Sequence, residues 1–182
     1  MSFDAVAKGR DPPRVVNVVV ETPRGSPVKY AAEDGGPGGA SFQASKFLGP
    51  GFRYPANAGF FARCWGEDGD PLDALVLCDA PLVPGTLVSV RPVAVLRMRD
   101  RGRRDDKVVC VAEADPAWRS ARDLRDVPGP LRKGLDAFHS GYRTYEGTQG
   151  AVRLEGWRGA REAHRLIEAG YRRFAARQAD AS

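Results

Sequence analysis

The stretch Asp68-Gly-Asp70-Pro-Leu-Asp73 leads directly into the short apolar run 74–77. Glycine and proline favour a turn, and a short apolar run after a turn is typical of a buried β-strand. Three carboxylates within six residues repel one another unless protons or a cation compensate them, and hard divalent cations prefer oxygen ligands. The stretch therefore predicts a turn-to-strand junction that binds Mg²⁺, while a plain acidic turn remains the alternative.

Short apolar segments separated by Gly, Pro or Asp lie on both sides of this junction. β-Branched and aromatic residues between turn residues predict strands, and many short strands favour a small barrel. The run Ala31–Ala40 holds four glycines and a proline and is predicted to be a loop. The expected strands are Val15–Glu21, Val28–Tyr30, Phe60–Cys64, Leu72–Cys78, Thr86–Met98 and Lys107–Glu113.

The last third of the chain changes from strand to helix patterning. Apolar residues recur every three or four positions over 131–142 and again over 163–174, which predicts two amphipathic helices. The second helix is rich in arginine, but Glu162 and Glu168 are interspersed at a spacing that allows ion pairs. A solvated face is therefore favoured over a nucleic-acid or membrane surface.

Composition limits the class of protein. The chain has 182 residues, 42% of them hydrophobic, which fits one globular domain over residues 1–182 with a core at about 15–177. Its net charge is +5, with arginine far exceeding lysine, so phosphate-bearing partners fit. Cys64, Cys78 and Cys110 are widely spaced and suggest buried reduced thiols. With no signal peptide or membrane span expected, the prediction is a cytoplasmic protein.

Further candidate residues lie elsewhere in the sequence. Asp100 and the pair Asp105-Asp106, followed by Lys107, fall between two expected strands, where a charged hairpin tip is normally just solvated. Glu21 ends the first expected strand. The two histidines, His139 and His164, stand alone on the expected helices, and no Cys-x-x-Cys pair suggests zinc.

Taken in their order along the chain, these features resemble the soluble Mg²⁺-dependent inorganic pyrophosphatases of the first family. The resemblance runs from about Val15 to the C-terminal helix, and Asp68-Gly-Asp70-Pro-Leu-Asp73 matches that family's signature. The other matching segments are Val-Glu21-Thr-Pro, Val-Lys29-Tyr30, Arg-Tyr54-Pro-Ala-Asn57, Arg91-Pro-Val-Ala-Val-Leu96, Asp100 with Asp105-Asp-Lys107, and Leu-Glu-Gly-Trp157.

The resemblance implies an α+β fold, a small OB-like closed barrel with helices outside, and an acidic cavity that holds several Mg²⁺ ions. It implies that Asp68, Asp73 and Asp105 hold the tight metal, that Asp73 bridges to a second, that Asp100 and Asp105 hold a third, and that Glu21 reaches metal through water. Asp70 becomes the general base. The implied catalytic and substrate-binding groups are Lys29, Lys46, Tyr54, Lys107, Tyr142 and Arg143.

Several positions depart from the family pattern. Ala31 stands where a glutamate is usual, Lys46 where an arginine binds phosphate, and Ala58 and Phe60 where tyrosines are expected. Arg143 replaces a lysine and keeps its charge. These changes leave open a diverged enzyme that acts on an organic diphosphate or another phosphate-containing metabolite. A non-catalytic OB-type binding module is a second alternative, because OB-type barrels often bind nucleic acid and the arginine excess permits it.

Partners follow from the same resemblance. A small diphosphate is expected as substrate, with no nucleic acid and no membrane. Bacterial relatives commonly form hexamers through histidines on the penultimate helix, but Ala137 and Gly141 occupy those positions here. A homo-oligomer is therefore an open expectation without support from these residues.

Overall fold

The apolar segments of the sequence form strands, most of which belong to one barrel, while the strands Val28–Gly36 and Gly39–Phe47 make a separate two-stranded sheet. The computed structural model describes residues 3–36, 39–141 and 152–180. Its strands are β1 (Val16–Thr22), β2 (Val28–Gly36), β3 (Gly39–Phe47), β4 (Asn57–Trp65), β5 (Pro71–Leu77), β6 (Leu87–Asp100), β7 (Arg103–Arg104), β8 (Lys107–Ala112) and β9 (Val152–Gly159). Its helices are α1 (Gly129–Gly141) and α2 (Ala160–Asp180), with short 3₁₀ helices at Phe3–Ala5, Pro116–Trp118 and Leu124–Asp126.

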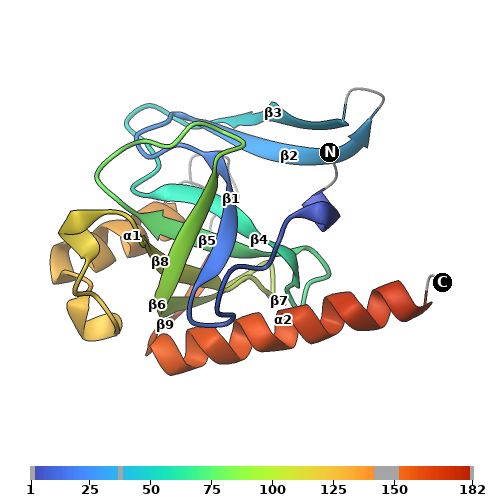
Figure 1. The fold of residues 1–182 in the computed structure, drawn as a ribbon. Coiled ribbons are helices and arrows are strands. Elements are labelled where there is room, and N and C mark those ends of the chain that lie inside the picture. Colours follow the sequence, from blue (N-terminus) through green and yellow to red (C-terminus); the bar gives the residue numbers. More distant parts are fainter. Residues whose placement is uncertain (1–2, 37–38, 142–151, 181–182) are drawn as a thin grey trace.

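Five strands close into the barrel that the resemblance implies (Figure 1). Their order is β1-β4-β5-β8-β6, and β6 pairs back with β1 to complete the circle. The pairing of β5 with β8 is parallel, whereas the neighbouring pairings are antiparallel. β9 and the short β7 pair with the far half of the long strand β6. A closed barrel leaves its member strands without free edges, which stabilises such short strands.

The central strands are buried on both faces. Val76 packs in one apolar cluster that includes residues of α2, while its neighbours Leu75 and Leu77 belong to a second cluster with Leu135 of α1. β8 alternates in the same way between the two clusters. Strands buried on both sides read as continuous apolar runs, which explains why the sequence identified them so directly.

The two expected helices are present outside the barrel. α2 runs along one end of the barrel, and α1 lies at its side (Figure 1). Gly170 sets the approach of α2 to β4, because a Cβ atom there would lie 2.3 Å from Cys64 Sγ and 3.0 Å from the Trp65 carbonyl oxygen. No helix among residues 3–36, 39–141 and 152–180 combines the length and apolar character needed to cross a bilayer.

The loop prediction for residues 31–40 is wrong. β2 and β3 pair antiparallel, with Ala31 opposite Gln43, Glu33 opposite Ser41 and Gly36 opposite Gly39. Backbone pairing therefore extends the strands into a glycine-rich stretch with little apolar pattern. β3 and β9 were not predicted as strands for the same reason.

The prediction that the three cysteines are buried thiols without a disulfide is confirmed. Cys64, Cys78 and Cys110 are free thiols and all three are buried. Burial in apolar surroundings raises the pKa of the Cys64 thiol to about 12, because it disfavours the thiolate. Such thiols pack as small apolar side chains and are chemically inert.

Candidate active site

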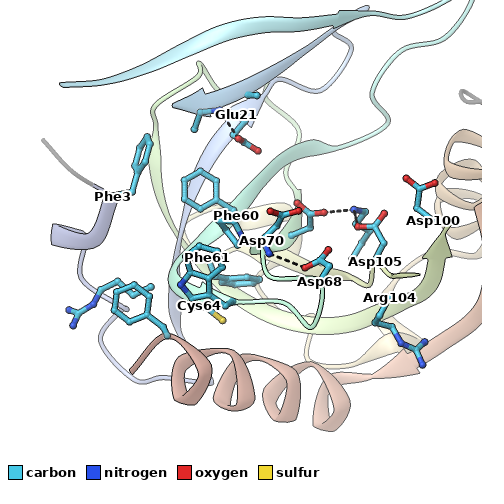
Figure 2. A pocket seen from close by; sticks show the side chains of 18 of the residues that line it. Phe3, Glu21, Phe60, Phe61, Cys64, Asp68, Asp70, Asp100, Arg104 and Asp105 are labelled. Atoms are coloured by element: carbon cyan, nitrogen blue, oxygen red, sulfur yellow. Dashed lines mark hydrogen bonds and ion pairs between the residues drawn. The ribbon is translucent and has the colours of Figure 1, made fainter. Parts of the chain in front are cut away.

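A cavity of about 560 Å³ gathers the charged residues that the sequence singled out. β1, β2, the β4–β5 turn, the β6–β8 region and α2 all contribute to its wall. Figure 2 shows the labelled carboxylates directed toward this space from different parts of the chain. Its charged lining includes Glu21, Lys29, Asp68, Asp70, Asp73, Asp100, Asp105 and Lys107. Every carboxylate to which the resemblance assigns a metal or general-base role therefore lies on one cavity.

The β4–β5 turn fixes two of these carboxylates. The Gly66 N–H donates to the Asp70 carbonyl oxygen at 2.7 Å, and the Asp70 N–H donates to Asp68 Oδ1 at 3.1 Å. Gly69 has a φ of 91°, a backbone conformation that favours glycine. The local sequence thus folds into a tight turn that holds Asp68 and Asp70 at the cavity rim.

Strand register brings Asp73 and Lys107 together. Ala74 of β5 pairs with Val108 of the parallel strand β8. The residues that precede this pair, Asp73 and Lys107, therefore also lie side by side. The Lys107 ammonium donates to Asp73 Oδ2 and, at 2.7 Å, to Asp105 Oδ1. Its side chain is 13% exposed, and attraction from both carboxylates raises the Lys107 pKa against the opposing effect of burial. Lys107 is a permanently charged group at the centre of the cluster.

Asp105 enters the cavity from the connection between β7 and β8. Its N–H donates to the Met98 carbonyl oxygen at 3.0 Å, which ties this connection to β6. Burial raises the pKa of the Asp105 carboxyl, and repulsion from Asp73 and Asp100 acts in the same direction. Nearby positive charge from Lys107 opposes that shift. The environment of Asp105 therefore disfavours the charged carboxylate, and a cation bound beside it would favour that charge.

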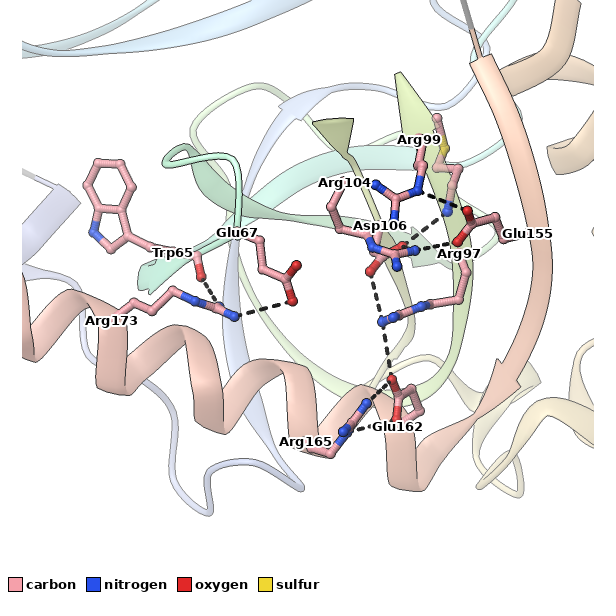
Figure 3. Close-up of polar contacts among 11 residues, drawn as sticks. Trp65, Glu67, Arg97, Arg99, Arg104, Asp106, Glu155, Glu162, Arg165 and Arg173 are labelled. Atoms are coloured by element: carbon pink, nitrogen blue, oxygen red, sulfur yellow. Dashed lines mark hydrogen bonds and ion pairs between the residues drawn. The ribbon is translucent and has the colours of Figure 1, made fainter. Parts of the chain in front are cut away.

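The next residue, Asp106, faces away from this cavity. It accepts a hydrogen bond from the Met98 N–H at 3.0 Å and pairs with the Arg97 guanidinium at 2.9 Å (Figure 3). Only 3% of its side chain is exposed. Of the adjacent pair Asp105-Asp106, one residue thus belongs to the candidate site and the other to the fold.

A β-bulge places Glu21. Val20 pairs with Gly59 and Thr22 with Ala58, so Glu21 is the extra residue on β1. Bulges re-aim a side chain and often occur beside active sites. Glu21 Oε1 accepts a hydrogen bond from the Ala32 N–H at 2.8 Å, and burial raises the pKa of its carboxyl.

The remaining predicted residues fall into three groups. Lys29 lines the main cavity and pairs with Lys46 across the β2–β3 hairpin, but Lys46 does not line that cavity. Tyr54 is buried and lines a second, smaller cavity beside the first. Tyr142 and Arg143 lie outside the described residues. For all of these residues, and for Lys107, a substrate contact stays a prediction.

Sequence reasoning missed His139 as a neighbour of the site. It is buried on α1 and lines the smaller cavity with Tyr54 and Ala58. A single histidine on an amphipathic helix carries no local signal, because the same pattern fits an ordinary core position. Only the packing of α1 against the barrel identifies it.

The donor chemistry of the cavity fits a divalent cation. The candidate ligands are carboxylates, whose oxygen atoms hard cations such as Mg²⁺ prefer. Burial, with repulsion from Asp73 acting in the same direction, raises the pKa values of Glu21 and Asp105. A bound cation would favour their charged forms. Within the described part of the chain, no three carboxylate, imidazole or thiol groups form a ready-made cluster for a metal ion. Lys107 instead lies between Asp73 and Asp105.

Comparisons with known proteins agree on one family. A family model described as inorganic pyrophosphatase matches residues 18–175. An inorganic pyrophosphatase from Leifsonia xyli is 39% identical over 85% of this chain and 93% of its own length, and one from Aeropyrum pernix is 37% identical over 93% and 95%. The crystal structure of inorganic pyrophosphatase from Thermus thermophilus matches with a TM-score of 0.88 at 35% identity, covering 96% of this chain and 99% of that one.

Proposed function

The chain belongs to the inorganic pyrophosphatase family, and we propose that it hydrolyses inorganic pyrophosphate to two phosphates in the carboxylate-lined cavity. The cavity lining holds seven carboxylates, two lysines and three arginines. The observation that carries this proposal is that all six carboxylates assigned to the site from the sequence, together with Lys29 and Lys107, converge on this one space. A binding module does not need so many charged side chains around one cavity. The family assignment likewise favours an enzyme over a non-catalytic module.

The carboxylates hold divalent cations, and Mg²⁺ fits their oxygen chemistry best. Asp68, Asp73 and Asp105 are the candidates for the tightest cation, Asp100 with Asp105 for a further one, and Glu21 for a contact through water. Bound cations supply two effects: they lower the pKa of water and neutralise phosphoryl oxygens.

Asp70 accepts the proton from the attacking water. The β4–β5 turn supports this role, because it holds the Asp70 backbone by two hydrogen bonds while leaving its side chain exposed at the cavity rim. The water oxygen forms a bond to one phosphorus as the bridging P–O bond breaks, and the second phosphate leaves. A positioned general base typically contributes roughly 100- to 10,000-fold to the rate.

Lys29 and Lys107 neutralise and orient the diphosphate. Both line the cavity, and the contacts of Lys107 with Asp73 and Asp105 raise its pKa and so favour its charged form. Phosphoryl transfer depends mainly on positioning and electrostatic stabilisation, which fixed ammonium groups provide.

Phosphate release from pyrophosphate by purified protein with Mg²⁺ tests this function. Asp70→Asn should lower kcat by roughly 100- to 10,000-fold while leaving the circular dichroism spectrum unchanged. Asp79→Asn is the matched control, because Asp79 is exposed and lies outside the cavity. Wild-type protein that releases no phosphate would refute the function, and an active Asp70→Asn variant would refute the general-base assignment.

One observation favours a second candidate, an organic diphosphate as substrate. The cavity has an aromatic side, where Figure 2 shows Phe3, Phe60 and Phe61 away from Asp100 and Asp105, and its volume of about 560 Å³ leaves room beyond the charged cluster. Water would attack the terminal phosphorus, and the products would be phosphate and an organic monophosphate. Assaying aryl and alkyl diphosphates beside pyrophosphate decides between the two substrates.

A further inference from the structure

A second cavity of about 70 Å³ adjoins the carboxylate-lined cavity. The two spaces share four lining residues, namely Glu21, Lys29, Asp73 and Lys107. A polar cavity of this size has room for at least one water molecule, so it is accessible to a small polar group. The second cavity is therefore an extension of the active site toward α1.

A small side chain opens this space. Ala58 of β4 pairs with Thr22 on one side and with Leu75 of β5 on the other, so it lies between the strands that carry Glu21 and Asp73. Its methyl group lines the cavity without filling it. Tyr54 and His139 lie on the wall contributed by residues outside β4.

His139 is a buried residue with a polar ring on that wall. Only 5% of the residue is exposed, so a hydrogen bond from its ring to a group in the cavity would be shielded from bulk water. Burial, aided by the positive charge of Lys107, lowers the pKa of the imidazole to about 3. The ring is therefore neutral at physiological pH, with one nitrogen that donates and one that accepts.

We propose that the second cavity is a phosphoryl subsite in which His139 donates a hydrogen bond to an oxygen of the bound diphosphate. Lys29 and Lys107 border both cavities and neutralise the same phosphoryl group. The neutral imidazole adds a directional donor without adding charge beside these two ammonium groups. This inference rests on the proposed function and extends phosphate recognition to a residue of α1.

His139→Phe tests the subsite, because it keeps a ring of similar size against Phe138 and removes both nitrogens. Loss of one neutral hydrogen bond predicts a KM for pyrophosphate raised about 3- to 10-fold, with kcat changed less than KM. The affinity for inorganic phosphate, measured by calorimetry with Mg²⁺ present, should fall by a similar factor. His139→Gln restores a donor and should recover part of both losses.

Two further variants keep the test decisive. Ala58→Leu fills the cavity while His139 stays in place, and it should weaken phosphate binding as His139→Phe does. His164→Phe makes the same chemical change on α2, outside both cavities, and should leave KM and phosphate affinity at wild-type values. Unchanged KM and phosphate affinity in His139→Phe, with only the melting temperature altered, would overturn the subsite. The phosphate titration stands without turnover, so failure of the subsite is distinguishable from failure of pyrophosphate hydrolysis.

Discussion

At the scale of single residues, the surroundings of two cavity carboxylates disfavour their charged forms. Burial raises the pKa values of Glu21 and Asp105, and Asp73 repels both. Lys107 compensates part of this charge through its contacts with Asp73 and Asp105. The arrangement lowers the stability of the metal-free protein, and it prepares oxygen ligands for cations.

Glu21→Gln should therefore stabilise the metal-free protein at pH 8. A carboxyl whose folded-state pKa is raised favours folding below its ordinary pKa near 4.5, and that contribution is lost as pH rises through the folded pKa. The glutamine keeps an oxygen for the Ala32 N–H and carries no charge. Thermal unfolding in EDTA should show a higher Tm for the variant at pH 8 and a smaller difference at pH 4.

Glu33→Gln provides the control for this substitution. Glu33 is exposed on the β2–β3 hairpin and accepts a hydrogen bond from Gln43 rather than facing the cavity. Its Tm should follow that of the wild type at both pH values. A Glu21→Gln variant less stable than the wild type at pH 8 would contradict the electrostatic account.

At the scale of elements, a network of ion pairs, the most buried of them between Arg97 and Asp106, connects the strands that carry the site (Figure 3). Arg97 of β6 pairs with Asp106 at 2.9 Å and with Glu162 of α2 at 3.1 Å. Arg99 and Arg104 both pair with Glu155 of β9. These contacts fix the connection that carries Asp105, because Asp106 is its immediate neighbour.

Arg97→Met should lower the free energy of unfolding by about 3 kcal/mol. It removes a guanidinium from Asp106, whose side chain is 3% exposed, and an uncompensated buried charge is strongly destabilising. Arg104 remains 3.7 Å from Asp106, so the loss should lie at the low end of that range. Urea unfolding measures the change.

Arg165→Met is the matched control for the network. Arg165 pairs with the same Glu162, but its side chain is 68% exposed, and water screens such a pair. The urea midpoint of this variant should stay within error of the wild type. Equal losses in both variants would show that burial of the Arg97 pair does not matter.

How far the sequence predicted these elements depends on where each one is buried. β5 and β8 lie inside the molecule on both faces, so their apolar runs identify them without further information. β3 and β9 carry mixed patterns on partly exposed surfaces and become strands through backbone pairing with β2 and β6. Local pattern does not encode such pairing.

The site divides in a similar way. The turn at Asp68–Asp73 has a strong local pattern, whereas Glu21 takes its place from a bulge and Asp106 turns away from the cavity beside Asp105. His139 reaches the site only because α1 packs against the barrel. Local sequence pattern does not identify residues whose role depends on tertiary packing. Such residues could be proposed only from the resemblance to a family, and some of them, such as His139, could not be proposed at all.

At the scale of the whole molecule, the fold brings carboxylates that are distant in sequence to one cavity, where they repel one another. A bound cation relieves this repulsion, so Mg²⁺ should stabilise the folded protein. A ligand bound only by the native state adds about 2.7 kcal/mol at 100 times its Kd. Protons compete for the same oxygens, and the raised pKa values of Glu21 and Asp105 mean that this stabilisation should fade at a higher pH than ordinary carboxylates would allow. Measuring Tm against Mg²⁺ concentration at several pH values from 8 down to 4 tests this prediction. KCl at matched ionic strength is the control for general salt effects. The Asp73→Asn variant should lose the Mg²⁺ response. An equal Tm shift from KCl, or an undiminished Mg²⁺ shift in Asp73→Asn, would mean that the cavity does not bind the cation through these carboxylates.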